Sequence, residues 1–220
     1  MMNQDKELID LFKGLDTPAV SDAMDKLGIP GQCLGIKALE RYRDTIVGPA
    51  FTVKYVPCGQ PAGTVGDFID DVQPGDVIVI DNDGRIDCTV WGDIMTQYAG
   101  IRGIAGTVIN GVCRDVYRAI DENYPIFSIN HIMRTGKDRV EVASVNQPVA
   151  VGTTRVAARD IVVADANGVL AVPRNKAREV AEIARKIESA ENEIRKMISQ
   201  GMTLREARRL MGYHQLQTKT

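Results

Sequence analysis

The stretch that decides the fold is residues 76–128, DVIVIDNDGRIDCTVWGDIMTQYAGIRGIAGTVINGVCRDVYRAIDENYPIFS. Three short apolar runs in it indicate buried strands, and two helical patterns separate them. The runs cover residues 76–80, 106–109 and 125–128, and the helical patterns cover residues 91–98 and 114–122. Strands that alternate with helices through short links are typical of βαβ units. The stretch therefore predicts an α/β fold with a mostly parallel sheet.

The sequence before this stretch predicts two helices and a strand. The second helix should have Thr17 as its N-cap and Pro18 at its first position, and Gly28 should end it after Leu27. The other expected elements are a helix over residues 4–13, a loop over 30–42, a strand over 46–56 and a Gly/Pro-rich break over 59–66.

The sequence after it changes to short strands only, which are expected at residues 140–145, 149–151, 161–164 and 168–172. We therefore expect an α/β unit and a β-rich unit around one core. This body would span residues 1–173.

A helical tail is expected over residues 174–220. Its apolar residues recur at alternating steps of three and four, which is the narrow seam of a coiled coil. They are Val180, Ile183, Ile187, Ala190, Ile194 and Met197. The tail either packs on its own domain or reaches across a subunit boundary, and residues 202–211 would add a short helix with a basic face.

Length and composition indicate one ordinary globular domain with an appendage. The chain has 220 residues, of which 44% are hydrophobic and 25% are charged. No apolar run approaches the ~20 residues of a membrane span. The first residues are too charged for the apolar centre of a signal peptide. We expect a cytoplasmic protein without a membrane partner.

Charge is unevenly distributed. The net charge is −2, but residues 174–220 hold 11 Lys and Arg against 6 Asp and Glu, whereas residues 1–173 hold 16 against 23. A basic tail on an acidic body favours docking on another copy of the chain. With only 5% aromatic residues for base stacking, the sequence does not favour nucleic-acid binding.

Cysteine and histidine usage narrows the possible chemistry. Four cysteines occur singly, and His131 and His214 are isolated. This pattern gives little support to a zinc site, a disulfide framework or a Ser-His-Asp triad. Catalysis would instead use carboxylates, arginine, backbone amides or a hard metal ion.

Two turns carry residues that fit such chemistry. Arg114 and Asp115 follow the turn after strand 106–109, where ligands bind in open α/β sheets. They could clamp a carboxylate beside an acidic ligand, or they could merely cap a helix. Gly92 and Asp93 lie one helix and one strand earlier, so they should reach the same sheet edge, where the amides of residues 93–95 could point at a ligand. This set would suit a 2-oxo acid together with Mg²⁺ or Mn²⁺.

The segments WGDIM (91–95) and GIAGTVINGVCRDV (103–116) closely resemble the family of 4-hydroxy-4-methyl-2-oxoglutarate aldolase and the regulator of ribonuclease activity A. Supporting matches are DTPAVSDAMDKLG (16–28), GPAFTV (48–53), PGDVIVID (74–81) and ADANGVLAVP (164–173). The resemblance implies a β/β/α sandwich of swivelling-domain type. It also implies a homo-oligomer, either a trimer or a hexamer.

The resemblance also implies roles for individual residues. Asp115 would bind the divalent metal, and Asp93 would contact it through water. Arg114 would hold the pyruvyl group, and the amides of Gly92, Asp93, Ile94 and Met95 would cradle the substrate. Glu191 of a neighbouring subunit would complete the site, with Glu193 as the weaker match. Glu191 could equally be a solvated helix charge.

The implied activity is a divalent-metal-dependent lyase that cleaves a 4-hydroxy-2-oxo acid to pyruvate, with oxaloacetate decarboxylation as a side activity. Arg118 stands where family aldolases often carry an acid, and the family's non-catalytic regulator lacks that acid too. A regulator that binds a partner such as ribonuclease E therefore stays an alternative. So does a different reaction on a 2-oxo or sugar acid at the same metal site.

The loop over residues 128–140 also departs from the aldolase pattern. His131, Arg134 and Lys137 in it could tune the site for another acid, or the loop could be plain surface.

Overall fold

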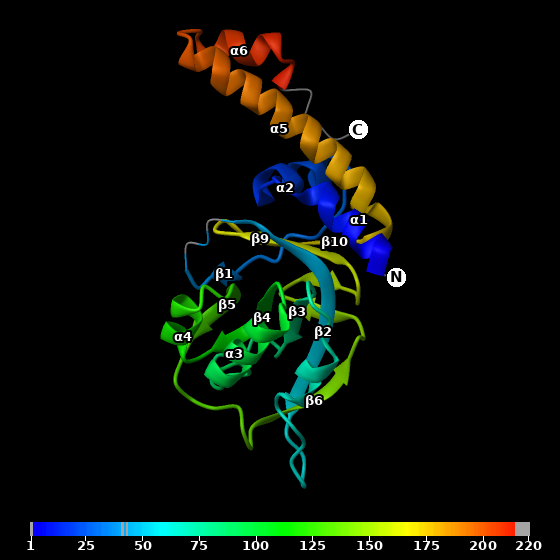
Figure 1. Ribbon diagram of the computed structural model, residues 1–220, viewed down its shortest axis with the longest axis vertical. Coiled ribbons are helices and arrows are strands. Elements are labelled where there is room, and N and C mark those ends of the chain that lie inside the picture. The colour runs from blue at the N-terminus through cyan, green and yellow to red at the C-terminus, as the bar shows by residue number, and fades with distance from the viewer. Residues whose placement is uncertain (1, 41, 43, 214–220) are drawn as a thin grey trace.

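A computed structural model describes residues 2–40, 42 and 44–213 of the chain. His214 and residues 215–220 of the expected tail lie outside this described part. The central element of the fold is one long strand, β2 (Ile46–Pro57), which runs through both halves of the molecule (Figure 1). The division into a body and a tail at residue 173 stays a prediction.

The main sheet is mixed. Its order is β1-β5-β4-β3-β2-β9-β10, and β6 pairs with β2 beside this path. Its other strands are β1 (Lys37–Ala38), β3 (Val77–Asp81), β4 (Gly106–Cys113), β5 (Ile126–His131), β6 (Val140–Val145), β9 (Ile161–Asp165) and β10 (Gly168–Val172). The pairings β2–β3, β3–β4 and β4–β5 are parallel, and the other four are antiparallel.

The prediction of a mostly parallel sheet is therefore right for the block from β2 to β5 and wrong for the whole sheet. For one of the four antiparallel pairings, that of β9 with β10, the physical reason is the length of the link. The turn between β9 and β10 is only two residues long, and such a turn can join antiparallel strands only.

The sheet is nearly closed by residues that the sequence assigns to a loop. Within residues 30–42, Cys33 N donates to Val169 O at 2.9 Å, and Ala171 N donates to Gly31 O at 2.8 Å. Farther along the same segment β1 pairs with β5. The chain thereby links β10 to β5 across the open side of the sheet. The structure shows a mixed α/β fold of this kind, and the more specific swivelling sandwich stays a prediction.

Strand alternation divides the buried residues into three clusters. On β3, Val77 and Val79 face the interior of the nearly closed sheet, while Ile78 and Ile80 face outward beneath helices. On β9 the same alternation places Val162 in the interior and Ile161 beneath the other helical layer. A strand that is covered on both faces needs apolar side chains on both of them. This is why these runs are continuously apolar and do not alternate with polar residues.

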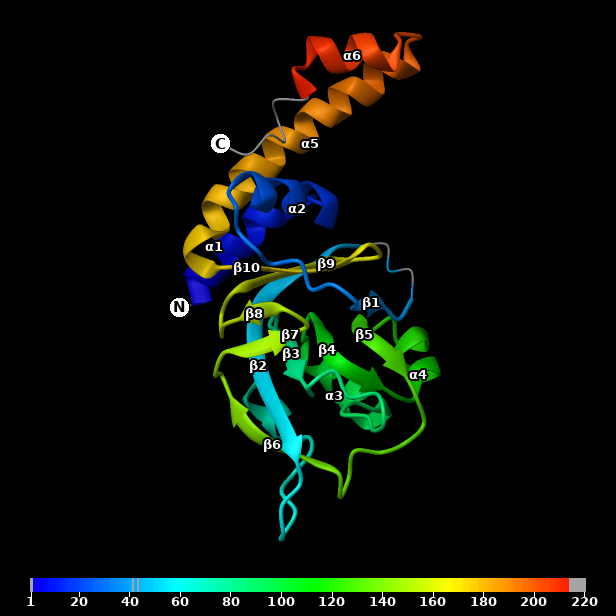
Figure 2. The same ribbon diagram turned by 180° about the vertical axis from the view of Figure 1, so that it is seen from behind.

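Two helical layers cover the sheet from opposite ends (Figure 1). The helices α1 (Met2–Phe12), α2 (Thr17–Lys26) and α5 (Ala177–Ser199) lie over β9 and β10, and α3 (Asp93–Arg102) and α4 (Val116–Asp121) lie beside β4 and β5. The hairpin of β7 (Val149–Val151) and β8 (Thr154–Val156) is visible from behind (Figure 2). Two short 3-10 helices, Asp67–Asp71 and Arg174–Lys176, complete the elements together with α6 (Leu204–Leu210).

The N-cap of helix α2 lies one residue earlier than predicted. Asp16, and not Thr17, is its N-cap, because the Asp16 side chain accepts a hydrogen bond from Ala19 N at 2.9 Å. The amide and hydroxyl of Thr17 instead donate to the buried carboxylate of Asp165, at 2.8 and 2.7 Å. Thr17, the expected capping residue, is therefore bound to Asp165, a tertiary partner that the local sequence does not reveal.

The elements around the expected site also have different limits. Helix α3 begins at Asp93 and not at residue 91, and β4 continues to Cys113 through the predicted turn at residues 110–113. Because the pairing of β4 with β5 shifts its register between Ile109 and Val112, the strand passes an irregularity without ending there. Helix α4 consequently begins at Val116, so Arg114 and Asp115 precede it and do not open it.

Most of the apolar seam of α5 is buried within the chain, and only Ile183 and Met197 are half-buried. Val180, Ile187 and Ile194 are all buried, and α5 packs on α1 and α2 near its start and on α6 near its end. This packing favours the first interpretation of the tail, in which the helix covers its own domain. A contact across a subunit boundary stays a prediction, although α5 projects well beyond the sheet (Figure 1).

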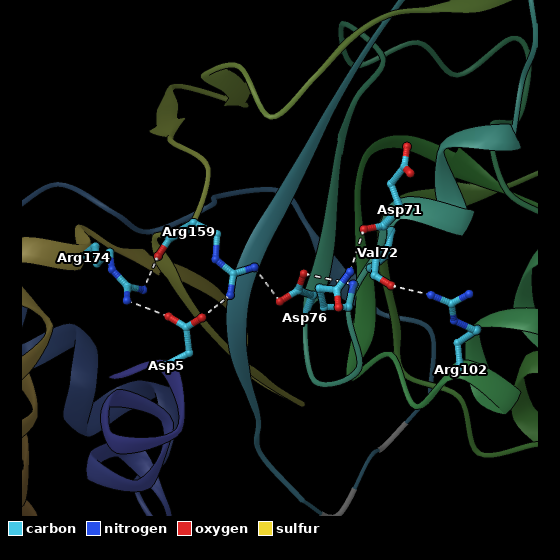
Figure 3. Close-up of polar contacts among 8 residues, drawn as sticks. Asp5, Asp71, Val72, Asp76, Arg102, Arg159 and Arg174 are labelled. Atoms are coloured by element: carbon cyan, nitrogen blue, oxygen red, sulfur yellow. Dashed lines mark hydrogen bonds and ion pairs between the residues drawn. The ribbon is translucent and has the colours of Figure 1, made fainter. Parts of the chain in front are cut away.

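A charged network ties α1 to the rest of the body (Figure 3). The Asp5 carboxylate pairs with Arg159 and, at 2.6 Å, with Arg174. Arg159 in turn pairs with the buried carboxylate of Asp76 at 2.7 Å. The network therefore joins the first helix, the start of β3 and the end of β10. In the described part of the chain, no helix combines the length and the apolar character that crossing a bilayer needs.

Candidate active site

The expected site residues meet at the carboxyl edge of the parallel block. Residues 89–92 run beside the end of β4, where Val90 N donates to Val112 O at 3.4 Å and Arg114 N donates to Trp91 O at 3.0 Å. This pairing brings Gly92 and Asp93 against Arg114 and Asp115, as their positions after neighbouring elements suggest. Ile94 and Met95 follow in the first turn of α3.

Trp91 anchors this edge. Its side chain is buried, its Nε1 donates to Thr96 Oγ1 at 3.0 Å, and its ring stacks on Tyr124 with centroids 6.1 Å apart. Because the indole N–H is satisfied inside the protein, Trp91 fixes the backbone of the next residues by packing.

Gly92 permits a close approach that no other residue would. A Cβ atom at this position would lie 2.8 Å from Asp115 Oδ2 and 3.2 Å from Arg114 Nε. The first distance is shorter than real Cβ contacts allow, so a side chain here would displace the Asp115 carboxylate. The glycine is therefore part of how the two charged groups are positioned.

Asp115 is held in an unusual backbone conformation. Its φ of 57° lies in the left-handed region, which costs energy for a residue with a side chain. Its Oδ2 accepts a hydrogen bond from Asp93 N at 3.2 Å and lies 3.2 Å from Arg114 Nε. The side chains of Arg114 and Asp115 remain 38% and 39% exposed, so both can meet a ligand.

Asp93 and the first amides of α3 offer a polar cradle of limited size. The exposed Asp93 side chain accepts from Ile94 N at 2.9 Å, and Asp93 N donates to Asp115. The Met95 amide has no acceptor among the residues that the structure describes, and it lies at a helix N-terminus, where N–H groups favour anions. Of the expected cradle amides 93–95, two are thus already engaged within the protein.

These residues open into a cavity of about 220 Å³. Its lining comes from Val65, residues 89–95, Arg114 and residues 135–137. Asp115 lies outside this lining, against Gly92 and Arg114. Sequence reasoning missed Val65, Thr89, Thr135 and Gly136, and no local pattern marks them, because only tertiary contacts bring them here.

The segment of residues 132–139, here called the strap, closes one side of the cavity. Thr89 N donates to Arg134 O at 2.9 Å, and a Cβ at Gly136 would lie only 2.2 Å from Thr89 O. Lys137 lines the cavity, whereas His131 and Arg134 do not. Of the three polar residues singled out in this loop, the structure therefore brings one to the site.

The carboxylates at the site fit a hard divalent ion that keeps most of its water. In the described ranges, no three His, Cys, Asp or Glu side chains gather closely enough to hold a metal. Mg²⁺ is usually bound through only one or two carboxylates and retains several waters. Asp115 and Asp93 supply such a pair, with Asp115 Oδ2 already oriented by the Asp93 amide.

Glu191 lies away from this cavity in its own chain. It belongs to α5, on the opposite side of the sheet from α3 (Figure 1), where it bonds to Arg195 at 2.8 Å and to the Tyr213 hydroxyl at 3.3 Å. Glu193 lies 3.7 Å from Lys196 on the same helix. A role for either glutamate in a neighbouring subunit's site stays a prediction.

Two further side chains near the site are accounted for by their neighbours. Arg118 pairs with Glu122 one turn along α4, and only its backbone amide contacts Asp115, at 3.1 Å to the carbonyl oxygen. Cys113 is fully buried, and burial raises the pKa of its thiol, so a reactive thiolate is disfavoured.

Comparison with known proteins identifies the family. The model of the RraA-like family, described as Aldolase/RraA, matches residues 17–171. The chain belongs to this family. The matched residues include every residue that lines the cavity, and they run from the start of α2 into β10. This match confirms the resemblance that the motifs suggest.

Two curated relatives illustrate the range of the family. A Legionella pneumophila protein named DlpA is 40% identical over 199 residues, which are 89% of this chain, and the chain spans about a third (32%) of its length. A Halalkalibacterium halodurans protein named "putative 4-hydroxy-4-methyl-2-oxoglutarate aldolase" is 33% identical over 197 residues, covering 89% of this chain and 90% of that protein.

Solved structures of the family share the fold. A protein from Pseudomonas syringae pv. tomato has a TM-score of 0.86 at 42% identity, covering 92% of this chain and 97% of its own. Streptomyces coelicolor RraAS2, described as an unusual member of the RNase ES inhibitor RraA family, has a TM-score of 0.77 at 26% identity, covering 90% and 98%. The family thus includes proteins named as aldolases and as ribonuclease inhibitors.

Proposed function

We propose that the protein is a divalent-metal-dependent lyase that cleaves a 4-hydroxy-2-oxo acid to pyruvate and an aldehyde or oxo acid. The observation that supports this most directly is that Arg114 and Asp93 line one cavity, while Asp115 lies directly beside them, against Gly92. The names of family relatives as aldolases point to the same reaction class. Mg²⁺ or Mn²⁺ would be held by Asp115, and by Asp93 through water.

Arg114 would bind the 2-oxo acid end of the substrate. Its guanidinium is half exposed at the cavity and presents N–H donors that match a carboxylate and its neighbouring oxo group. The Met95 amide at the start of α3 would add a donor for the same anionic end. Binding at this point fixes the pyruvyl half and leaves the hydroxyl-bearing carbon toward the rest of the cavity.

The bond-breaking step needs a base and a place for negative charge. A water held by the exposed Asp93 carboxylate takes the proton of the 4-hydroxyl group, and that oxygen becomes the new carbonyl as the C3–C4 bond breaks. The bonding electron pair moves to the pyruvyl half as an enolate, which Arg114 stabilises before C3 is protonated. The divalent ion, when bound, would act as a Lewis acid on the 2-oxo group. Oxaloacetate decarboxylation would develop the same charge, so we expect it as a side activity.

A coupled assay of pyruvate release tests this function. The assay uses 4-hydroxy-2-oxo acids and oxaloacetate with Mg²⁺, and with EDTA in its place. We expect EDTA to abolish release and Asp115→Ala to lower kcat/KM by at least about 100-fold, as removal of a group that stabilises developing charge does. A parallel incubation without protein corrects for decarboxylation by the metal alone.

A second function is favoured by Arg118. This residue stands one turn after Asp115 and pairs with Glu122, so no carboxylate extends from that position toward the cavity. The same departure occurs in the family's non-catalytic regulator, and RraAS2 is described as a relative of ribonuclease inhibitors. Absence of pyruvate release from every substrate would favour a regulator of a partner such as ribonuclease E. A metal-dependent reaction on other 2-oxo or sugar acids would be the third possibility.

A further inference from the structure

Two cationic residues line the candidate cavity, and they differ in how their charge is compensated. Arg114 Nε lies 3.2 Å from Asp115 Oδ2, so its charge is partly balanced within the protein. Lys137 has no ion-pair partner among the described residues. Asp93 is the other charged residue of the lining.

The backbone at Lys137 is ordered by its neighbours. Lys137 N donates to Thr135 Oγ1, and Arg139 Nη1 donates to the carbonyl oxygens of both Thr135 and Lys137, each at 3.2 Å. Gly136 packs directly against Thr89 O, which itself belongs to the cavity lining. Lys137 therefore lies at the cavity because the backbone of the strap is packed and hydrogen-bonded there. The strap is not a free loop.

The strap's other charged residues do not compete for this position. Arg134 contributes its carbonyl oxygen to Thr89, Arg139 is engaged with the strap backbone, and Asp138 does not line the cavity. A volume of about 220 Å³ suits a small acid, since it is below the range of about 300–1,000 Å³ of typical ligand pockets.

We propose that Lys137 is a specificity-determining residue that pairs with a second carboxylate on the half of the substrate that leaves. The inference rests on the proposed lyase function. Arg114 takes the 2-oxo acid end, and the uncompensated ammonium group of Lys137 takes the negative charge at the other end. The site thus selects doubly charged acids by an interaction that is separate from the bond-breaking step.

Two substrates that differ only in the distal group test the proposal. 4-Hydroxy-2-oxoglutarate carries a carboxylate where 4-hydroxy-2-oxopentanoate carries a methyl group, and both release pyruvate by the same cleavage. In Lys137→Ala we expect KM for the dicarboxylic acid to rise about tenfold more than KM for the monocarboxylic acid, the equivalent of one charge-assisted hydrogen bond. The change should lie in KM and not in kcat.

Conservative and control variants separate this role from a structural one. Lys137→Arg should keep most of the preference, and Lys137→Glu should reverse it. Lys6→Ala removes another exposed lysine, on α1 at the other end of the molecule, and should leave the ratio of the two KM values as it is. Equal effects of Lys137→Ala on both substrates, or no effect on either, would overturn the proposal.

A binding measurement tests Lys137 even if the chain cleaves neither acid. Calorimetric titration with 2-oxoglutarate and 2-oxopentanoate, in the presence of Mg²⁺, compares the same two distal groups without turnover. We expect the wild-type protein to bind 2-oxoglutarate about tenfold more tightly and Lys137→Ala to lose this preference. If the variant retains the preference, or the wild type shows none, the assignment of Lys137 is wrong. Loss of pyruvate release alone would instead overturn the lyase function.

Discussion

At the scale of single residues, the candidate site depends on positions where the backbone is under constraint. Asp115 adopts a left-handed conformation, and Gly92 leaves room for its carboxylate. The sequence places Gly92 beside Asp93 and Arg114 beside Asp115, but it contains no sign that Gly92 would touch Asp115. The spacing alone predicts that these residues share a sheet edge, which the structure confirms.

Gly92→Ala should reduce activity more than stability. Its Cβ would lie 2.8 Å from Asp115 Oδ2, so this carboxylate must shift, and 3.2 Å from Arg114 Nε, which must give way by a smaller amount. We expect kcat/KM for pyruvate release to fall about 100-fold, since displacements near 1 Å can cost that much. Steady-state kinetics and thermal unfolding measure the two effects.

Gly100→Ala is the matched control for this prediction, because it also lies in the region of α3 but has open space around the added methyl group. It should raise stability by about 0.5–1 kcal/mol through helix propensity and leave turnover near the wild-type value. Equal kinetic losses in both variants would contradict the role given to Gly92.

At the scale of elements, the sequence patterns predict the existence of the helices and strands better than they predict the residues at which these begin and end. The helices and strands of residues 76–128 are all present, in the expected order. Their ends differ because backbone groups near them have tertiary partners. Trp91 O accepts from Arg114 N, so residue 91 pairs beside β4 and cannot begin a helix. Thr17 is used by Asp165, so Asp16 becomes the cap of α2.

Asp16→Ala tests this assignment of the cap. The variant removes the acceptor for Ala19 N and should lower the free energy of unfolding by about 1 kcal/mol, as loss of an N-cap usually does. Asp16→Asn retains an acceptor and should remain within about 0.3 kcal/mol of the wild type. Urea denaturation measures both. A loss in Asp16→Asn as large as that in Asp16→Ala would show that the charge of Asp16, and not its capping bond, matters.

At the scale of the whole molecule, long-range charge pairs hold the first helix to the body. Arg159 joins Asp5 of α1 to Asp76 at the start of β3 (Figure 3). Burial favours a higher pKa for Asp5, but the hydrogen bonds and charges of Arg159 and Arg174 outweigh it and lower that pKa below its usual range. For Asp76, burial dominates and raises the pKa.

Asp5→Asn should destabilise the protein in a pH-dependent way. At pH 7 we expect a loss of about 2 kcal/mol, because a charge-assisted hydrogen bond from Arg159 and an ion pair with Arg174 are removed. A carboxyl group whose pKa is lower in the folded state stabilises the fold above its unfolded pKa of about 4, and this contribution is lost as pH falls through the folded value. The difference between the variant and the wild type should therefore shrink below about pH 4.

Denaturant unfolding at pH 7 and in the acid range measures this difference. A difference is needed, because burial raises the pKa of Asp76 in both proteins and this contributes with the opposite sign. The Asp5 charge adds to the rise only in the wild type. Glu7→Gln is the matched control: its exposed pair with Arg178 also starts on α1, and it should cost less than about 1 kcal/mol. An Asp5→Asn loss that does not depend on pH would contradict the ion-pair explanation.

The sequence by itself determined the α/β class, the parallel central block and the sheet edge where Arg114, Asp115 and Asp93 meet, because strand and helix periodicities are local and consecutive turns of such units share an edge. Only the tertiary structure decided that residues 31–38 nearly close the sheet, that Gly136 and Thr89 bring Lys137 to the cavity, and that α5 packs on α1 and α2. These contacts join residues far apart in the chain, and their geometry depends on backbone hydrogen bonds and close packing that no local pattern encodes.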